Sequence, residues 1–183
     1  MNNKLYAAID IGTNAGRMLI GKVINDNGYY TVKQIQLVRV PLRLGEDVFD
    51  TGAISDSKIK QFILTMKSFK FLAKAYGIKS IVAYSTSAMR EANNAKIVIE
   101  KIKKKTKINL KVIDGEREAE LIFKSFNING FMGQKPFLFI DVGGGSTELT
   151  VYSNGKKRNS ASFKIGTLRM LKNKVKSDVW KNI

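Results

Sequence analysis

Apolar residues in this chain follow several different spacings, and each spacing predicts an element. Near the N-terminus lie three runs rich in apolar and β-branched residues, at 4–11, 17–24 and 29–39. Short polar segments separate them, with Asn-Asp-Asn-Gly at 25–28, so an antiparallel meander is expected. Residues 56–76 carry apolar side chains at intervals of three and four, which predicts a long helix with Ser55 as its N-cap and Gly77 just beyond its end.

The middle of the chain alternates between short apolar runs and helix patterns. Strands are expected at 78–84 and 109–113, and helical segments at 88–92, 94–106 and 116–127. Beyond a polar stretch at 127–135, three strands and a helix are expected, at 136–141, 147–153, 157–165 and from about Gly166. The order strand, strand, strand, helix therefore occurs twice. It predicts an α/β fold with two related lobes around a cleft, the first at 1–127 and the start of a second at 128–183.

Composition narrows the chemistry that this chain can perform. The 183 residues include no cysteine and no histidine, which excludes disulfides, thiolate catalysis and imidazole ligands. Catalysis must then use carboxylates, Lys, Arg, hydroxyl groups or a metal held by oxygen, for which Mg²⁺ or Mn²⁺ is expected. No apolar run suggests a membrane span or a signal peptide, so a cytoplasmic protein is predicted. The net charge of +17 favours polyanionic partners, although lysine runs such as 101–107 are also typical of a solvated helix end.

The segment from Asp141 to Glu148 is the most informative part of the chain. A buried strand ends at an acid, three glycines and a hydroxyl pair follow, and a second strand leaves the corner. Consecutive glycines let the backbone approach a ligand closely and turn its N–H groups toward it. The residues expected to bind phosphate here are Gly143, Gly144, Gly145 and Ser146. A tight hairpin corner is the plainer alternative.

A weaker copy of this pattern lies near the N-terminus. It is again an apolar strand followed by an acid, an apolar residue and glycine, and its candidate phosphate-binding residues are Asp10, Gly12, Thr13 and Asn14. Because Asp-x-Gly is also a common turn, the repetition of the pattern is what favours a functional interpretation. The two loops together would bind a phosphate chain or a nucleotide from both sides of a cleft.

At these residues the chain resembles the exopolyphosphatase/guanosine-pentaphosphate phosphohydrolase (Ppx/GppA) family of the actin, Hsp70 and sugar-kinase superfamily. The resemblance rests on five segments in the family's order: Ala8–Asn14, Ser85–Asn94, Asp114–Ile122, Asp141–Glu148 and Ile165–Arg169. It implies two ribonuclease-H-like, actin-like ATPase lobes. Members of the family are usually longer, so the second lobe is expected to be truncated. Ala15 also departs from the family, which usually has Ser there.

The resemblance also implies roles for individual residues. It makes Glu118 the general base that activates water, and its flanking acids Glu116 and Glu120 are expected to face solvent. The residues themselves suggest a further role, because Asp141 and Glu148 lie on either side of the glycine corner and are expected to hold Mg²⁺. The predicted catalytic residues are therefore Glu118, Asp141 and Glu148. Arg90 is expected to contact phosphate. The plainer alternatives are a helix-start acid for Glu118, a surface strand residue for Glu148 and a surface ion pair for Arg90.

The activity implied is hydrolysis of the terminal phosphoanhydride bond of inorganic polyphosphate, guanosine pentaphosphate, or both. One alternative is an ATP-dependent phosphotransferase or ATPase of the same superfamily. The other is a non-catalytic polyanion-binding module, in which an incomplete second lobe leaves apolar strand surface exposed and favours a homodimer. Neither a membrane nor a nucleic acid is an expected partner.

Overall fold

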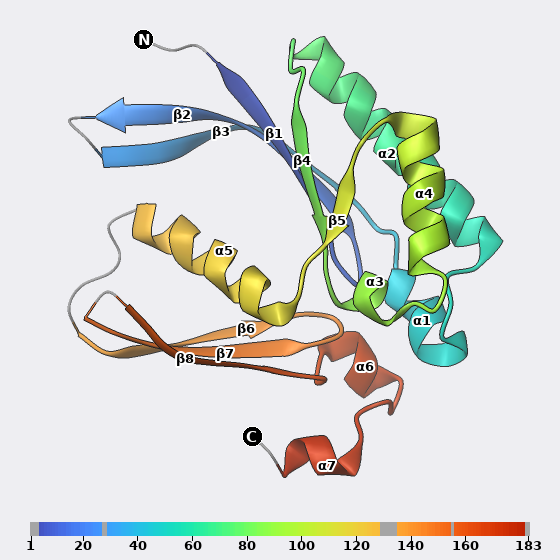
Figure 1. Cartoon of the computed structure of the whole chain (residues 1–183), viewed down its shortest axis with the longest axis vertical. Coiled ribbons are helices and arrows are strands. Elements are labelled where there is room, and N and C mark those ends of the chain that lie inside the picture. The colour runs from blue at the N-terminus through green and yellow to red at the C-terminus, as the bar shows by residue number, and fades with distance from the viewer. Residues whose placement is uncertain (1–3, 27–28, 129–134, 155, 182–183) are drawn as a thin grey trace. The chain divides into compact units, whose positions relative to one another are not determined.

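The computed structural model describes residues 4–26, 29–128, 135–154 and 156–181, in two compact units that meet in sequence between Val112 and Ile113 (Figure 1). The sequence had placed this division at residue 127, followed by a linker at 127–135, of which 129–134 lie outside the described residues. Within the described residues, no helix is long and apolar enough to cross a membrane.

Unit 1 contains a five-stranded sheet in the order β3-β2-β1-β4-β5. Its strands are β1 (Leu5–Ile11), β2 (Gly16–Asp26), β3 (Tyr29–Val40), β4 (Ile81–Ser85) and β5 (Leu110–Val112). The first three form the predicted antiparallel meander, and β4 and β5 join it in parallel to β1. Along β1, Ala7, Ile9 and Ile11 are buried whereas Asp10 is exposed, which is the alternation of a strand with one covered face.

Four helices accompany this sheet: α1 (Leu44–Thr51), α2 (Asp56–Ala75), α3 (Ser87–Glu91) and α4 (Ala95–Thr106). The long helix α2 follows its predicted limits closely. The Ser55 side chain accepts a hydrogen bond from the Lys58 amide at 3.4 Å, and Gly77 adopts φ 69° beyond the C-terminal end. Core side chains of α2 and α4 include Phe62, Met66, Phe69, Val98 and Ile102.

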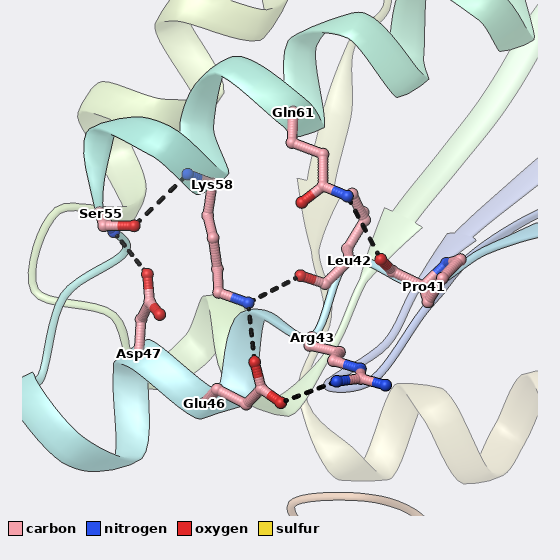
Figure 2. Close-up of polar contacts among 8 residues, drawn as sticks. All are labelled: Pro41, Leu42, Arg43, Glu46, Asp47, Ser55, Lys58 and Gln61. Atoms are coloured by element: carbon pink, nitrogen blue, oxygen red, sulfur yellow. Dashed lines mark hydrogen bonds and ion pairs between the residues drawn. The ribbon is translucent and has the colours of Figure 1, made fainter.

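The helix α1 was not predicted, and Figure 2 shows what holds it. Its N-cap, Arg43, has the left-handed conformation (φ 50°) and makes no capping hydrogen bond through its side chain. Instead, Lys58 of α2 donates from Nζ to the Leu42 carbonyl at 3.2 Å and to Glu46 Oε2 at 3.0 Å. Asp47 Oδ2 accepts from the Ser55 amide at 2.9 Å. These contacts come from another element, so the local sequence pattern did not predict the helix.

Unit 2 pairs one long helix with a three-stranded antiparallel sheet. Its elements are α5 (Gly115–Ile128), β6 (Phe137–Val142), β7 (Thr147–Ser153), β8 (Lys156–Phe163), α6 (Thr167–Leu171) and α7 (Ser177–Trp180). Tyr152 is 1% exposed, and its ring stacks on Phe123 of α5 at 4.0 Å and on Phe137 at 5.1 Å. This aromatic stack packs α5 against the sheet of unit 2, so the helix is part of that unit.

Candidate functional site

The first corner loop lies between β1 and β2 and is tied down through its carbonyl groups. The Gly12 amide donates to the Ala15 carbonyl at 3.0 Å, closing the loop on itself. The Thr13 carbonyl accepts from Gly45 at 3.0 Å, and the Asn14 carbonyl accepts from Arg43 at 2.8 Å. In a trans peptide the N–H of the next residue points opposite to the carbonyl. The amides of Asn14 and Ala15 therefore point away from the 43–45 segment.

Two further candidate residues lie at this end of the unit 1 sheet. Asp10 is opposite Arg17 in the β1–β2 register, with Asp10 Oδ2 3.8 Å from Arg17 Nη1 and both side chains about half exposed. The Thr86 amide donates to the Ile11 carbonyl at 3.1 Å, which anchors the start of α3 beside the loop. Arg90, in the last turn of α3, is half-buried. Thr13, the candidate hydroxyl of the first loop, is more buried than Asp10 and Arg90, with only 5% of its surface exposed.

The second corner loop, between β6 and β7, repeats the hydrogen bonding of the first. The Gly143 amide donates to the Ser146 carbonyl at 2.8 Å, at the same spacing as Gly12 and Ala15. Behind the loop, the Gly143 carbonyl accepts from Thr167 at 3.0 Å and the Gly144 carbonyl accepts from Leu168 at 3.0 Å.

The carbonyl of Gly145 accepts from the Arg169 side chain, with Nε at 2.8 Å. Three successive carbonyls of the loop thus face α6. By the same peptide geometry, the amides of Gly144, Gly145 and Ser146 point to the opposite side. Successive N–H groups on one side of a turn form a concave site suited to an anion.

A row of polar side chains crosses the sheet of unit 2 beside this loop. The register pairs Asp141 with Glu148 and Glu148 with Ser162, so all three share one face. Glu148 is 2% exposed, and its Oε1 accepts from Ser162 Oγ at 2.9 Å. Two carboxylates on adjacent strands provide the hard oxygen ligands that Mg²⁺ prefers. Among the described residues, no group of three or more acidic, His or Cys side chains could hold a metal ion.

The first turn of α5 lies against this row. A Cβ added to Gly115 would be 2.7 Å from Ser162 Cβ and 3.6 Å from Glu148 Oε1, so glycine permits the close approach. Asp114 begins the helix, since its Oδ1 accepts from the Arg117 amide at 2.8 Å and its carbonyl accepts from the Glu118 amide at 3.0 Å. Glu118 follows in the first turn and is half-buried.

The two acids that flank Glu118 have other partners. Glu116 is 77% exposed, as expected, and its Oε1 is 2.9 Å from Lys157 Nζ. Glu120 is 39% exposed, less open than expected, and it pairs with Lys124 at 2.7 Å and with Arg117. The hydrogen bonds from Lys124 and then Arg117 lower the pKa of Glu120 to about 2.

Four residues that contribute to this geometry were not singled out from the sequence: Gly115, Ser162, Gly166 and Arg169. Ser162 needed the β7–β8 register, which is irregular between Val151 and Tyr152 and so cannot be obtained by counting along the sequence. Gly115, Gly166 and Arg169 lie in segments that carried the family resemblance, and those segments were the available signal.

The chain is similar to known phosphatases in sequence and in fold. A family profile described as the Ppx/GppA phosphatase family matches residues 23–182. A bifunctional 3-dehydroquinate synthase/phosphatase of Fusobacterium nucleatum is 35% identical over 174 residues, 92% of this chain and 26% of that protein. A guanosine-5'-triphosphate,3'-diphosphate pyrophosphatase of Aliivibrio fischeri is 27% identical over 168 residues, 91% of this chain and 33% of that protein.

Among solved structures, an exopolyphosphatase from Cytophaga hutchinsonii superposes with a TM-score of 0.84 and 30% identity, covering 93% of this chain and 53% of that one. This likeness confirms the predicted actin-like α/β fold class. The chain spans about half, or less, of the length of these relatives.

Proposed function

This chain belongs to the Ppx/GppA phosphatase family, and we propose that it hydrolyses the terminal phosphoanhydride bond of inorganic polyphosphate or guanosine pentaphosphate. The names of two similar proteins, an exopolyphosphatase and a guanosine-5'-triphosphate,3'-diphosphate pyrophosphatase, support these two substrates. A net charge of +17 suits either polyanion.

The observation that carries this proposal is the shared hydrogen bonding of the two corner loops. In each loop an amide donates to the carbonyl three residues later, from Gly12 to Ala15 and from Gly143 to Ser146. In each loop, the next carbonyls accept hydrogen bonds from the segment behind the loop, and the amides that follow these carbonyls point away from that segment. Such preorganised N–H donors stabilise the charge on phosphoryl oxygens as it develops. Arg90 would add a bidentate contact to phosphate.

Asp141 and Glu148 fit a magnesium ion, because their cross-strand pairing puts two carboxylates on one face beside the second loop. Ser162 occupies one oxygen of Glu148, which leaves the other as the proposed ligand. Bound Mg²⁺, or Mn²⁺ in its place, would neutralise phosphoryl oxygens and complete its coordination with water and substrate.

Glu118 is the proposed general base. Its carboxylate takes a proton from water, the water oxygen bonds to the terminal phosphorus, and the bond from phosphorus to the bridging oxygen breaks. The products are orthophosphate and a chain or nucleotide shortened by one phosphoryl group. Glu118 suits this role better than its neighbours, since Glu120 is committed to two cations and Glu116 lies in solvent.

A phosphate-release assay on the 183-residue chain tests the proposal. Polyphosphate, guanosine pentaphosphate and ATP are compared with and without Mg²⁺, using Glu118→Gln and the matched control Glu116→Gln. We expect Mg²⁺-dependent release from one of the first two substrates, a large loss of turnover in Glu118→Gln with binding retained, and near wild-type activity in Glu116→Gln. Binding of polyphosphate without any release would support the polyanion-binding module instead, and preference for ATP would support the phosphotransferase.

A further inference from the structure

The second corner loop is held from behind by a buried cation that the proposed mechanism does not use. Arg169 is 6% exposed, its Nε donates to the Gly145 carbonyl at 2.8 Å, and its amide donates to the Gly144 carbonyl at 3.2 Å. The guanidinium is always charged and is costly to remove from water. A buried Arg that bonds the loop through both side chain and backbone therefore constrains two neighbouring peptide groups.

Gly166 makes this close support possible. A Cβ at Gly166 would lie 2.4 Å from both the Gly144 carbonyl carbon and the Gly145 nitrogen, and 2.5 Å from the Gly144 oxygen. These contacts are with backbone, which cannot swing aside as a flexible side chain can. The neighbouring Ile165 carbonyl accepts from Thr147 Oγ1 at 2.7 Å, which fixes the segment to the start of β7. The approach of α6 to the glycine loop is thus sterically specified.

We propose that Arg169 is a positioning residue, which fixes the 144–146 peptides so that their amides converge on a terminal phosphate group. The Nε–H bond to the Gly145 carbonyl sets the plane of the peptide whose N–H belongs to Ser146. The guanidinium also places a permanent positive charge behind the loop, which attracts the anion through low-dielectric surroundings. This inference rests on the proposed function, because it assigns Arg169 to the same phosphate site.

Substitutions separate orientation from charge. Arg169→Met removes both, whereas Arg169→Lys keeps the charge and loses the Nε–H donor. Arg158→Met is the matched control, since Arg158 lies exposed on β8 of the same unit and its loss changes the net charge equally. The probe is inorganic tripolyphosphate, with affinity measured by calorimetry and the loop followed by amide NMR shifts of Gly144, Gly145 and Ser146.

For wild type we expect binding with shifts at those three amides. Affinity should fall at least about tenfold in Arg169→Met, as for the loss of one hydrogen bond to an ionised group. It should fall less in Arg169→Lys and stay unchanged in Arg158→Met. If Arg169→Met binds as tightly as wild type with the same shifts, the positioning role is overturned while the phosphate site stands. If wild type neither binds nor shifts, the site and the positioning role are overturned together.

A measurement on wild type alone covers the case in which Arg169→Met does not fold. The Arg169 Nε–H resonance should exchange slowly with solvent and should shift when tripolyphosphate moves the loop amides. An Nε–H resonance that exchanges fast, or that stays still while the loop amides respond, contradicts the inference.

Discussion

The close packing of Gly115 on Ser162 gives the sharpest quantitative test of unit 2. In Gly115→Ala the new methyl group would be 2.7 Å from Ser162 Cβ and 2.8 Å from Ser162 Oγ, so the helix or β8 must shift. Overpacking of this kind costs about 1–3 kcal/mol. The lower entropy of the unfolded chain with Ala returns about 0.4–1 kcal/mol, and Gly115 does not have a positive φ that would add strain. We therefore expect a net loss of about 1–2 kcal/mol.

A double-mutant cycle identifies the cause of that loss. In Ser162→Gly the colliding atoms are absent, and Glu148 Oε1 at 3.6 Å is an ordinary contact, so adding Gly115→Ala should be neutral or slightly stabilising. The expected coupling free energy is about 1–3 kcal/mol. Urea unfolding is followed by the fluorescence of Trp180, which lies in unit 2 and is the only tryptophan of the sequence. Ser160→Gly, two residues away on β8, is the control background. Equal effects of Gly115→Ala in the wild-type and Ser162→Gly backgrounds would refute the packing.

Three other predictions follow from the same contacts. The pKa of Glu120 is lowered to about 2 in the folded protein, so its ionised form stabilises the fold fully at a pH above its usual pKa of 4.5, and this stabilisation should disappear as the pH falls toward 2. The free energy of unfolding measured from pH 5 to pH 2 should therefore depend less on pH in Glu120→Gln than in wild type. Asn94 accepts from the Ile54 amide at 3.0 Å and donates to the Ile54 carbonyl at 2.8 Å, so Asn94→Ala should cost about 1–3 kcal/mol in urea unfolding. Asn94→Asp should not recover this loss, since its second carboxylate oxygen would face the Ile54 carbonyl oxygen. Burial raises the pKa of Tyr152 above the usual tyrosine value of 10. Ultraviolet titrations of wild type and of Tyr152→Phe should therefore differ by one tyrosine that ionises above pH 10, and ionisation of this tyrosine at or below pH 10 would contradict its burial.

Long periodic segments were predictable from the sequence because their own side chains decide them. Helix α2 was expected at 56–76 and lies at Asp56–Ala75, with the expected N-cap and terminal glycine. Helix α1 was missed because eight residues carry little periodicity, and Lys58 of another helix secures it. The apolar period of α5 indicated that the helix has a buried face. It could not indicate which sheet that face covers, and the stack on Tyr152 decides this.

The candidate site also contains some residues that the sequence could predict and some that it could not. The glycine corner, its acid and the cross-strand partner Glu148 were predictable, since a hairpin brings residues at fixed spacing together. Ser162 was not, because the irregular β7–β8 register decides which residue of β8 lies opposite Glu148. Arg169 was not predicted either, because a lone basic residue in a basic chain carries no sign of burial. Only the fold shows that its Nε meets the Gly145 carbonyl.

The two loops share one design but have different supports, and this difference bears on function. In the first loop, the carbonyls accept only from backbone amides, those of Arg43 and Gly45. In the second loop, the carbonyls accept from backbone amides of α6 and also from the buried guanidinium of Arg169. The first loop has Ala15 where the second has Ser146, and the residue paired with its acid is the cation Arg17 rather than the carboxylate Glu148. A carboxylate pair beside an N–H array favours a metal-bound phosphate, while an acid already paired with Arg does not. The second loop is therefore the better candidate for binding a phosphate together with a metal ion, and the first for binding an anion without one.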